Sequence, residues 1–204
     1  MRVVAGRAGG LRLKAVPGRG TRPTTDRVKE SVFGILGERC VDAVVLDLFA
    51  GTGSLGIEAL SRGAARAVFV ERDRSALRVL RENLLATGFA DRAQVWARDA
   101  MAILAGDGSG GGGAVGPFDL VFLDPPYGSG LAELAVRRLG ERADLLSPGA
   151  VVVAEHSNHQ ALPEKAGGLA LRRRQRYGET VVSFYRTAVD QPGTAVPEAG
   201  ERER

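Results

Sequence analysis

The 204-residue sequence has few of the residues that disulfide-bonded, metal-binding or membrane-spanning proteins need. Its single cysteine, Cys40, excludes an internal disulfide framework and is typical of a reducing compartment, so we expect a cytoplasmic protein. Its two histidines, His156 and His159, have no third or fourth ligand nearby in the chain, so we expect no metal. The longest apolar runs, such as "AVVLDLFA", are too short to cross a bilayer.

Positive charge is unevenly distributed along the chain. The net charge is +4, but residues 1–29 carry eight lysines and arginines against one acid, Asp26. Localised basicity is typical of a surface that faces a polyanion, although a solvated charged face explains it equally well. The candidate phosphate contacts are Arg2, Arg7, Arg12, Arg22, Arg27 and Lys29. We expect a second basic group, at 172–176, to be partly solvated surface.

From residue 43 onward, strand-forming and helix-forming segments alternate. We expect strands at 43–50, 65–71, 93–99, 118–124 and 150–156, and helices at 54–63, 73–88 and 131–142. Alternating units of this kind predict an α/β fold with a mostly parallel, Rossmann-like sheet covered by helices on both faces. The segment 169–188 predicts two antiparallel strands that turn at Tyr177–Gly178.

The chain is expected to have three parts. Residues 1–40 form a basic extension, with a β-hairpin in 1–16 and a helix that ends at Leu36. Residues 41–187 form the main domain, in which the glycine-rich stretch 106–116 is a mobile loop. Residues 188–204 form a disordered tail.

The stretch "VLDLFAGTGSLG" follows the first predicted strand and places Gly51, Gly53 and Gly56 in a G-x-G-x-x-G pattern. That pattern alone also suits a nicotinamide dinucleotide, and Gly53 could serve packing only. Asp47 stands just before the loop, where an anion repels phosphates but suits a cationic ligand. S-adenosylmethionine fits this position, because it carries an ammonium and a sulfonium and has no phosphate.

Acids also stand at the ends of the next three predicted strands, namely Glu71, Asp99 and Asp124. The carboxyl ends of parallel strands meet at one edge of a sheet, where ligands bind. A carboxylate at the position of Glu71 can bind both ribose hydroxyls, and one at Asp99 can receive an adenine amino group. Four carboxylates around a cation-bearing cofactor explain this arrangement better than chance surface placement.

The stretch "LVFLDPPYGSG", residues 120–130, runs a hydrophobic strand into Asp124, Pro125, Pro126 and Tyr127. The prolines stiffen the chain in an extended conformation and remove two backbone donors. An aromatic ring is thereby held next to a carboxylate. These residues suit the binding of a flat base that carries an amino group, although a strand ending in a proline turn is the simpler interpretation.

Together with "GTRPTTDRVKESVFGIL" upstream and "RYGET" downstream, these motifs resemble the RsmD family over roughly residues 1–187. Members of that family are class I S-adenosylmethionine-dependent methyltransferases of bacterial 16S rRNA. The resemblance implies methylation of the N2 amine of a guanine, at the family's position 966. It also implies a small ribosomal subunit, assembled or partly assembled, as the substrate; we expect the protein to be a monomer.

The resemblance assigns roles to two sets of residues. The expected cofactor-binding residues are Asp47, Phe49, Ala50, Gly51, Thr52, Gly53, Glu71, Arg72, Asp99 and Ala100. The expected catalytic residues are Asp124, Pro125, Pro126 and Tyr127. Asp124 and the Pro125 carbonyl would orient the amine, and Tyr127 would stack on the extruded base. The amine proton would go to Asp124 or to water.

Three alternatives are open at this point. An adenine-N6 DNA methyltransferase uses a similar D-P-P-Y loop, but no separate target-recognition domain is visible in the sequence. A nucleic-acid-binding module with a degenerate site would not need the intact glycines and carboxylates. An NAD-dependent oxidoreductase would need a residue for acid–base chemistry beside the glycines, and none is apparent.

Overall fold

A computed structural model describes residues 1–16, 26–106 and 116–188 of the chain. The predicted RNA contact Arg22, nearly all of the glycine-rich stretch and the tail beyond residue 188 lie outside these ranges. No helix of the described ranges is long and apolar enough to cross a bilayer.

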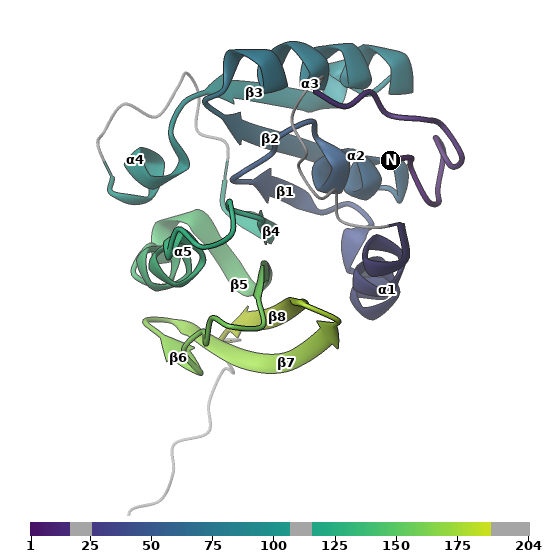
Figure 1. The fold of residues 1–204 in the computed structure, drawn as a ribbon. Coiled ribbons are helices and arrows are strands. Elements are labelled where there is room, and N and C mark those ends of the chain that lie inside the picture. Colours follow the sequence, from purple (N-terminus) through teal and green to yellow (C-terminus); the bar gives the residue numbers. More distant parts are fainter. Residues whose placement is uncertain (17–25, 107–115, 189–204) are drawn as a thin grey trace, which may run out of the picture.

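One sheet forms the centre of the described structure, with strand order β3-β2-β1-β4-β5-β8-β7-β6 (Figure 1). The parallel strands are β1 Val44–Asp47, β2 Arg66–Glu71, β3 Ala93–Ala97, β4 Phe118–Leu123 and β5 Leu146–Ser157. The antiparallel strands are β6 Lys165–Ala166, β7 Leu169–Tyr177 and β8 Thr180–Thr187. This order and these directions confirm the predicted Rossmann-like sheet and its antiparallel C-terminal hairpin.

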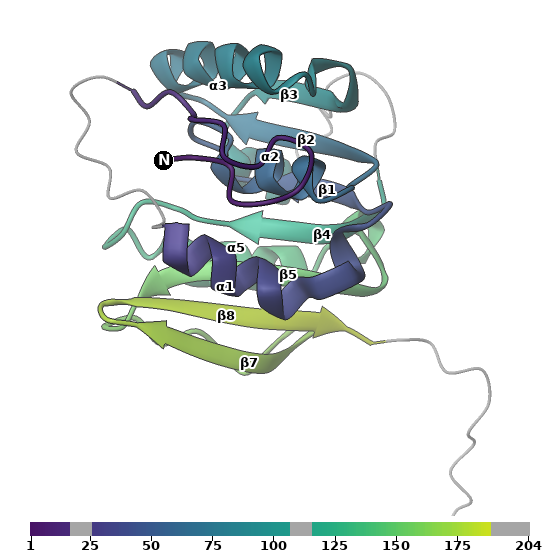
Figure 2. The same cartoon turned by 90° about the vertical axis from the view of Figure 1, so that its right-hand side faces the viewer.

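Helices cover both faces of the sheet (Figures 1 and 2). They are α1 Asp26–Leu36, α2 Ser54–Ser61, α3 Arg74–Thr87, α4 Ala100–Leu104 and α5 Leu131–Gly140, with 3-10 turns at Gly37–Cys40, Ala90–Arg92 and Ala143–Leu145. Apolar residues of α1, α2 and α3 belong to one core cluster, and those of α4 and α5 belong to another on the opposite face. The two clusters share the strands between them, because successive strand residues point to opposite faces.

Local signals set the bounds of α3. Asp73 is its N-cap, and the side chain accepts a hydrogen bond from the Ala76 backbone N–H at 2.9 Å. Gly88 ends the helix with a φ of 72°, in the left-handed region that favours glycine. The predicted helix bounds are confirmed here because both caps act within a few residues.

The N-terminal arm, residues 1–16, forms a turn with one β-bridge, between Arg2 and Arg12, in place of the two strands that we expected. Backbone bonds cross the arm beside this bridge, from the Val3 N–H to the Leu11 carbonyl at 2.9 Å and from the Leu13 N–H to the Met1 carbonyl at 3.1 Å, but the next N–H groups bond to α2. The N–H groups of Val4 and Ala5 donate to the Glu58 carboxylate at 2.7 and 3.0 Å. Groups that bond to a helix are not available for a strand ladder, and this explains the difference.

Candidate active site

The four predicted acids lie at the carboxyl edge of the parallel strands. Asp47 and Glu71 are the last residues of β1 and β2, Asp124 directly follows β4, and Asp99 lies two residues after β3. Neighbouring strands β1 and β4 are parallel, and the Leu48 N–H donates to the Phe122 carbonyl at 3.1 Å. The loop that follows β1 and the loop that follows β4 therefore leave the sheet side by side.

Residues 49–53 form a tight loop between β1 and α2. The Ala50 N–H donates to the Val70 carbonyl at 3.0 Å, and the Gly53 N–H closes a turn on the Ala50 carbonyl at 2.7 Å. Phe49 packs against the core cluster beside α4 and α5. The predicted loop therefore lies between the ends of β1 and β2, as a cofactor site at this edge requires.

Glycine suits two positions of this loop, 51 and 53, for different physical reasons. Both have a positive φ, 54° at Gly51 and 88° at Gly53. A Cβ at Gly53 would lie 2.4 Å from Leu80 Cδ1, so a larger residue there would have to displace the Leu80 side chain as well as adopt this φ. A Cβ at Gly51 would project into open space. The backbone at Gly51 is therefore open to the approach of a ligand.

Asp47 is buried, with 2% of its surface exposed. Its carboxylate accepts a hydrogen bond from the Gly56 N–H, in the first turn of α2, at 3.0 Å. Burial raises the pKa of Asp47 to about 7; the charge of Glu71 acts in the same direction, and the Gly56 hydrogen bond opposes it. Its contact with an ammonium group stays a prediction.

Glu71 holds the loop through its backbone. One carboxylate oxygen accepts a hydrogen bond from the Gly51 N–H at 2.9 Å. The other accepts from the N–H groups of Arg72 and Asp73, at 2.8 and 2.7 Å. A ribose at this position would share these acceptors with the backbone, so the role of Glu71 toward a ribose also stays a prediction.

Asp99 caps the short helix α4. Its side chain accepts from the Met101 N–H at 2.8 Å and from the Ala102 N–H at 3.3 Å. Its second oxygen binds the Arg72 guanidinium at 2.6 Å, and Ala100 is buried behind it. The structure thus brings Arg72, Asp99 and Ala100 together near the end of β3, and their recognition of adenine stays a prediction.

Asn83 of α3 is a site residue that sequence analysis missed. Its amide donates to the Thr52 carbonyl at 2.9 Å and to the Lys14 carbonyl at 3.1 Å, and its oxygen accepts from the Lys14 N–H at 2.8 Å. This buried side chain therefore ties the glycine loop to the N-terminal arm. The sequence signal was an amide within an otherwise apolar helix face.

The loop after β4 presents the predicted catalytic residues. Pro125 is buried and Pro126 is exposed, whereas Asp124 is half-buried. Tyr127 is 44% exposed, and its hydroxyl donates to the Glu155 carboxylate at 2.7 Å and also bonds the Thr180 hydroxyl at 2.9 Å. Burial of this hydroxyl and the nearby Glu155 charge raise the pKa of Tyr127 above its usual value, so the phenol stays protonated.

Glu155 and Thr180 were not among the predicted site residues. Glu155 lies near the end of β5, and the register pairs Leu123 with Ala154, so Asp124 and Glu155 follow paired residues at the same edge. Thr180 begins β8 and belongs to the "RYGET" stretch. The sequence did offer one signal for Glu155, because a carboxylate is unusual in an apolar strand such as "AVVVAEH".

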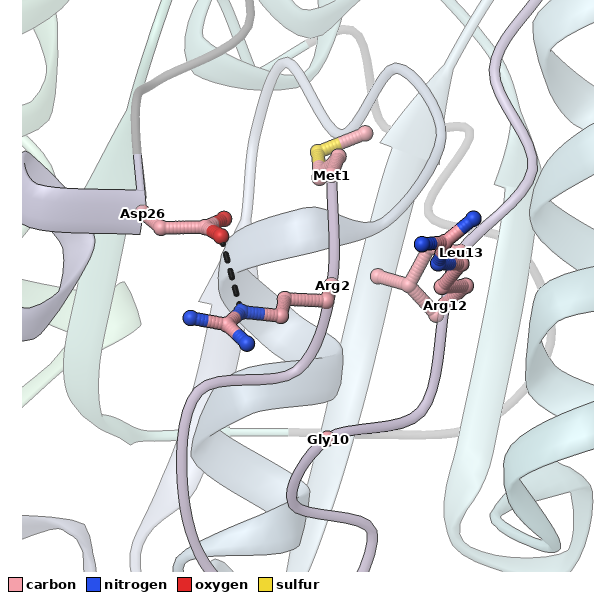
Figure 3. A pocket seen from close by; sticks show the side chains of 6 residues that line it. All are labelled: Met1, Arg2, Gly10, Arg12, Leu13 and Asp26. Carbon is pink, nitrogen blue, oxygen red and sulfur yellow. Dashed lines mark hydrogen bonds and ion pairs between the residues drawn. The ribbon is translucent and has the colours of Figure 1, made fainter.

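The predicted RNA contacts divide into an exposed set and a buried residue. Arg2, Arg7, Arg12 and Arg27 are exposed. Arg2 forms an ion pair with Asp26 at 2.9 Å. These two residues, together with Met1, Gly10, Arg12 and Leu13, line a hollow of about 600 Å³ beside the arm (Figure 3). Cationic side chains thus reach solvent along this arm.

Lys29 contradicts the prediction that it binds RNA. Its side chain is fully buried, and its ammonium lies 3.3 Å from the Glu58 carboxylate. It also donates to the Arg2 carbonyl and, at 3.3 Å, to the Ser54 hydroxyl. A lysine enclosed by these partners joins α1 and the arm to α2 and cannot reach a phosphate.

The two histidines are not arranged as metal ligands. His156 is buried, and its ring nitrogens lie 3.0 Å from the Ser157 carbonyl and 2.9 Å from the Ser183 hydroxyl. Burial lowers the pKa of His156 below its usual value. Residues 1–16, 26–106 and 116–188 contain no group of three or more side chains that could hold a metal ion.

Comparisons with known proteins agree with this arrangement. A family model described as "Conserved hypothetical protein 95" matches residues 1–186. The putative rRNA methyltransferase YlbH of Bacillus subtilis is 41% identical over 186 residues, covering 91% of this chain and 98% of the relative. Ribosomal RNA small subunit methyltransferase D of Escherichia coli K12 is 37% identical over 185 residues, covering 91% and 89%.

A solved structure supports the same relationship. The putative methyltransferase yhhF from Escherichia coli shares 36% sequence identity with this chain, covers 93% of it and is itself 99% covered, with a TM-score of 0.78. The strand order, the glycine loop at the end of β1 and the proline-rich loop at the end of β4 are features of class I methyltransferases. The chain belongs to the RsmD family of S-adenosylmethionine-dependent rRNA methyltransferases.

Proposed function

We propose that this protein transfers a methyl group from S-adenosylmethionine to the N2 amine of a guanine in 16S rRNA of the small ribosomal subunit. The observation that carries the proposal is the adjacency of two loops. The glycine loop leaves β1, and the Asp124–Tyr127 loop leaves the neighbouring strand β4 at the same edge. A cofactor in the first loop and a base at the second would lie side by side.

The residues at the ends of β1, β2 and β3 fit the cofactor. A backbone open to approach at Gly51 lies among the carboxylates of Asp47, Glu71 and Asp99, which suit a ligand with two positive charges and no phosphate. The cofactor supplies an electrophilic methyl group on a sulfonium. The protein's part is to bind and orient, through the loop 49–53 and these three acids.

Catalysis by the second loop depends mainly on position. The lone pair of a guanine N2 amine is delocalised into the ring, so correct alignment matters more than a strong base. In this proposal Asp124 and the Pro125 carbonyl accept the two amine N–H groups and turn the lone pair toward the methyl group. Tyr127, held by Glu155 and Thr180, stacks on the base. The proton then leaves to Asp124 or to water.

The N-terminal arm would position the RNA. The exposed Arg7 and Arg12 would contact phosphates, which fix the register of an RNA without reading its bases. The two relatives are named as a putative rRNA methyltransferase and a ribosomal RNA small subunit methyltransferase, which favours rRNA over DNA as the substrate. We expect the protein to act as a monomer in the cytoplasm.

Incubation with labelled S-adenosylmethionine and unmodified small subunits, followed by mapping of the modified nucleotide, tests the proposal. We expect one N2-methylated guanine in 16S rRNA. The variant Asp124→Ala should retain affinity for S-adenosylhomocysteine while turnover falls at least about 100-fold, a loss typical of a positioned catalytic group. The exposed Asp91→Ala serves as the control and should behave like the parent. Label in the adenine of DNA supplied in a parallel incubation, or full turnover by Asp124→Ala, would contradict the proposal.

A further inference from the structure

We propose that the β7–β8 hairpin is a second phosphate-binding surface for the RNA substrate, distinct from the N-terminal arm. This inference rests on the proposed function, because it names another part of the protein that holds the same RNA. The experiment below distinguishes failure of this inference from failure of the proposed function.

Charge is concentrated on this hairpin. Between residues 165 and 186 the chain has one acid, Glu179, and six cationic side chains: Lys165, Arg172, Arg173, Arg174, Arg176 and Arg186. The four arginines of β7 are exposed. A dense, exposed row of arginines on one strand is the electrostatic pattern of a surface that binds a polyanion.

Within the described ranges, three of these arginines contact neutral groups. Arg173 donates to the Gln175 amide at 3.3 Å, Arg174 to the Leu162 carbonyl at 2.5 Å, and Arg176 to the Gly178 carbonyl at 2.9 Å. These acceptors are neutral. None of the ion pairs found in the described ranges includes an arginine of β7.

The arginines of α5 show the contrast. Arg137 pairs with Glu133 at 2.8 Å, and Arg138 pairs with Glu141 at 3.4 Å. Both are exposed, as are the arginines of β7, but each has an acid within its own helix or just after it. These two residues therefore provide a matched control for charge removal at the surface.

The hairpin reaches the candidate active site through its turn. Tyr177, the last residue of β7, pairs with Thr180, and the Thr180 hydroxyl bonds Tyr127 at 2.9 Å. β7 runs in the same direction as β4 and β5, so Arg176 lies near the carboxyl edge. At about 3.3 Å per residue, Arg172 lies about 13 Å farther along the strand.

The arm and the hairpin flank the site from opposite sides. The arm packs on α2 and α3, beside β1 and β2, whereas β7 lies beyond β5 and β8 in the strand order (Figure 2). Asp124 follows β4, which lies between them. An RNA whose target base enters at Asp124 would therefore meet cationic side chains on both sides.

Protection of a sheet edge is the competing explanation. Leu169 and Ala170 of β7 pair with β6, and the Leu171 N–H donates to the Glu164 carbonyl at 2.7 Å, so within the described ranges the free edge of this strand begins at Arg172. Charged residues on such an edge prevent pairing with other chains. That role predicts self-association when the charges are removed and makes no prediction about RNA.

The test compares Arg172→Gln/Arg173→Gln with the control Arg137→Gln/Arg138→Gln. The β7 pair is chosen because neither side chain bonds a backbone carbonyl in the hydrogen bonds described above. Affinity for unmodified small subunits is measured from 50 to 400 mM salt. Each phosphate contact to a single strand contributes about 0.7 to the slope of log K against log salt concentration. Loss of two contacts should reduce the slope by about 1.4 and weaken binding about 25-fold near 0.1 M salt.

The control Arg137→Gln/Arg138→Gln should match the parent in slope. If the parent methylates rRNA but the variant binds with the parent's slope, the second surface is refuted and the proposed function stands. Self-association of the variant without a change in slope identifies edge protection as the role of these arginines, and it also refutes the second phosphate-binding surface. If the parent methylates no rRNA while the variant's slope falls, the surface is supported and the proposed reaction is wrong.

Discussion

Replacement of Asp47 by asparagine should make the protein more stable at pH 8. The pKa of Asp47 rises from 3.8 to about 7 on folding, because the carboxylate is fully buried. Asparagine has nearly the same shape, keeps an oxygen for the Gly56 N–H and carries no charge. The variant therefore removes the cost of burying the ionised group without removing the hydrogen bond to α2.

The magnitude follows from the shift of the pKa. About three units, at about 1.36 kcal/mol each, correspond to a cost of about 4 kcal/mol for the ionised form. Between pH 4 and pH 7 the folded protein holds a proton that the unfolded chain has released. The free energy of unfolding of the parent therefore falls as pH rises through this window. The buried amide of asparagine leaves an unpaired donor that costs about 1–3 kcal/mol, so the net gain at pH 8 is about 1–3 kcal/mol.

Urea unfolding of the parent and of Asp47→Asn at pH 4 and pH 8 measures this effect. The difference in unfolding free energy between the two proteins should move in favour of the variant as pH rises. A difference that is the same at both pH values would refute the argument that Asp47 is buried with a raised pKa. We also expect weaker binding of S-adenosylhomocysteine by Asp47→Asn, because a destabilising buried acid is typical of a functional site. The exposed Asp91→Asn is the control for both measurements.

Two further predictions concern residues that sequence analysis misassigned or missed. Lys29→Met should lower the free energy of unfolding by about 3 kcal/mol, because it leaves the buried Glu58 carboxylate without one of its cations. The control Lys165→Met, at an exposed residue, should change the free energy of unfolding little, and equal losses in the two variants would contradict the role of the buried pair. Thr180→Val should lower turnover about tenfold at unchanged affinity for S-adenosylhomocysteine, because it removes the hydroxyl that bonds Tyr127. Thr180→Ser keeps that hydroxyl and should retain most of the turnover, so equal turnover in the two variants would contradict the role of the hydroxyl.

Much of the fold could be predicted because its signals are local. The alternation of buried strands and amphipathic helices, the cap at Asp73 and the stop at Gly88 each depend on a few neighbouring residues. The placement of Asp47, Glu71 and Asp124 at one edge followed from the rule that parallel strands end together. These features need no knowledge of the tertiary contacts.

The misassigned and missed residues depend on contacts between distant parts of the chain. Lys29 and Glu58 are 29 residues apart, and no local pattern shows that they bury each other. Tyr127, Glu155 and Thr180 come from three separate segments and meet only because β8 lies beside β5. Val4 and Ala5 of the arm bond to the Glu58 carboxylate, which is more than fifty residues away in the chain.

The contacts of Glu58 also limit which truncations of the chain can fold. A fragment that starts at residue 41 would retain this carboxylate inside α2 but lose Lys29 and the N–H groups of Val4 and Ala5. Of the partners described here, only Arg62 would be left to neutralise it. Such a fragment should fail to fold, and a transplanted extension would need α2 as its acceptor. For any domain-swap or fusion experiment, residues 1–16, α1 and the sheet are one unit.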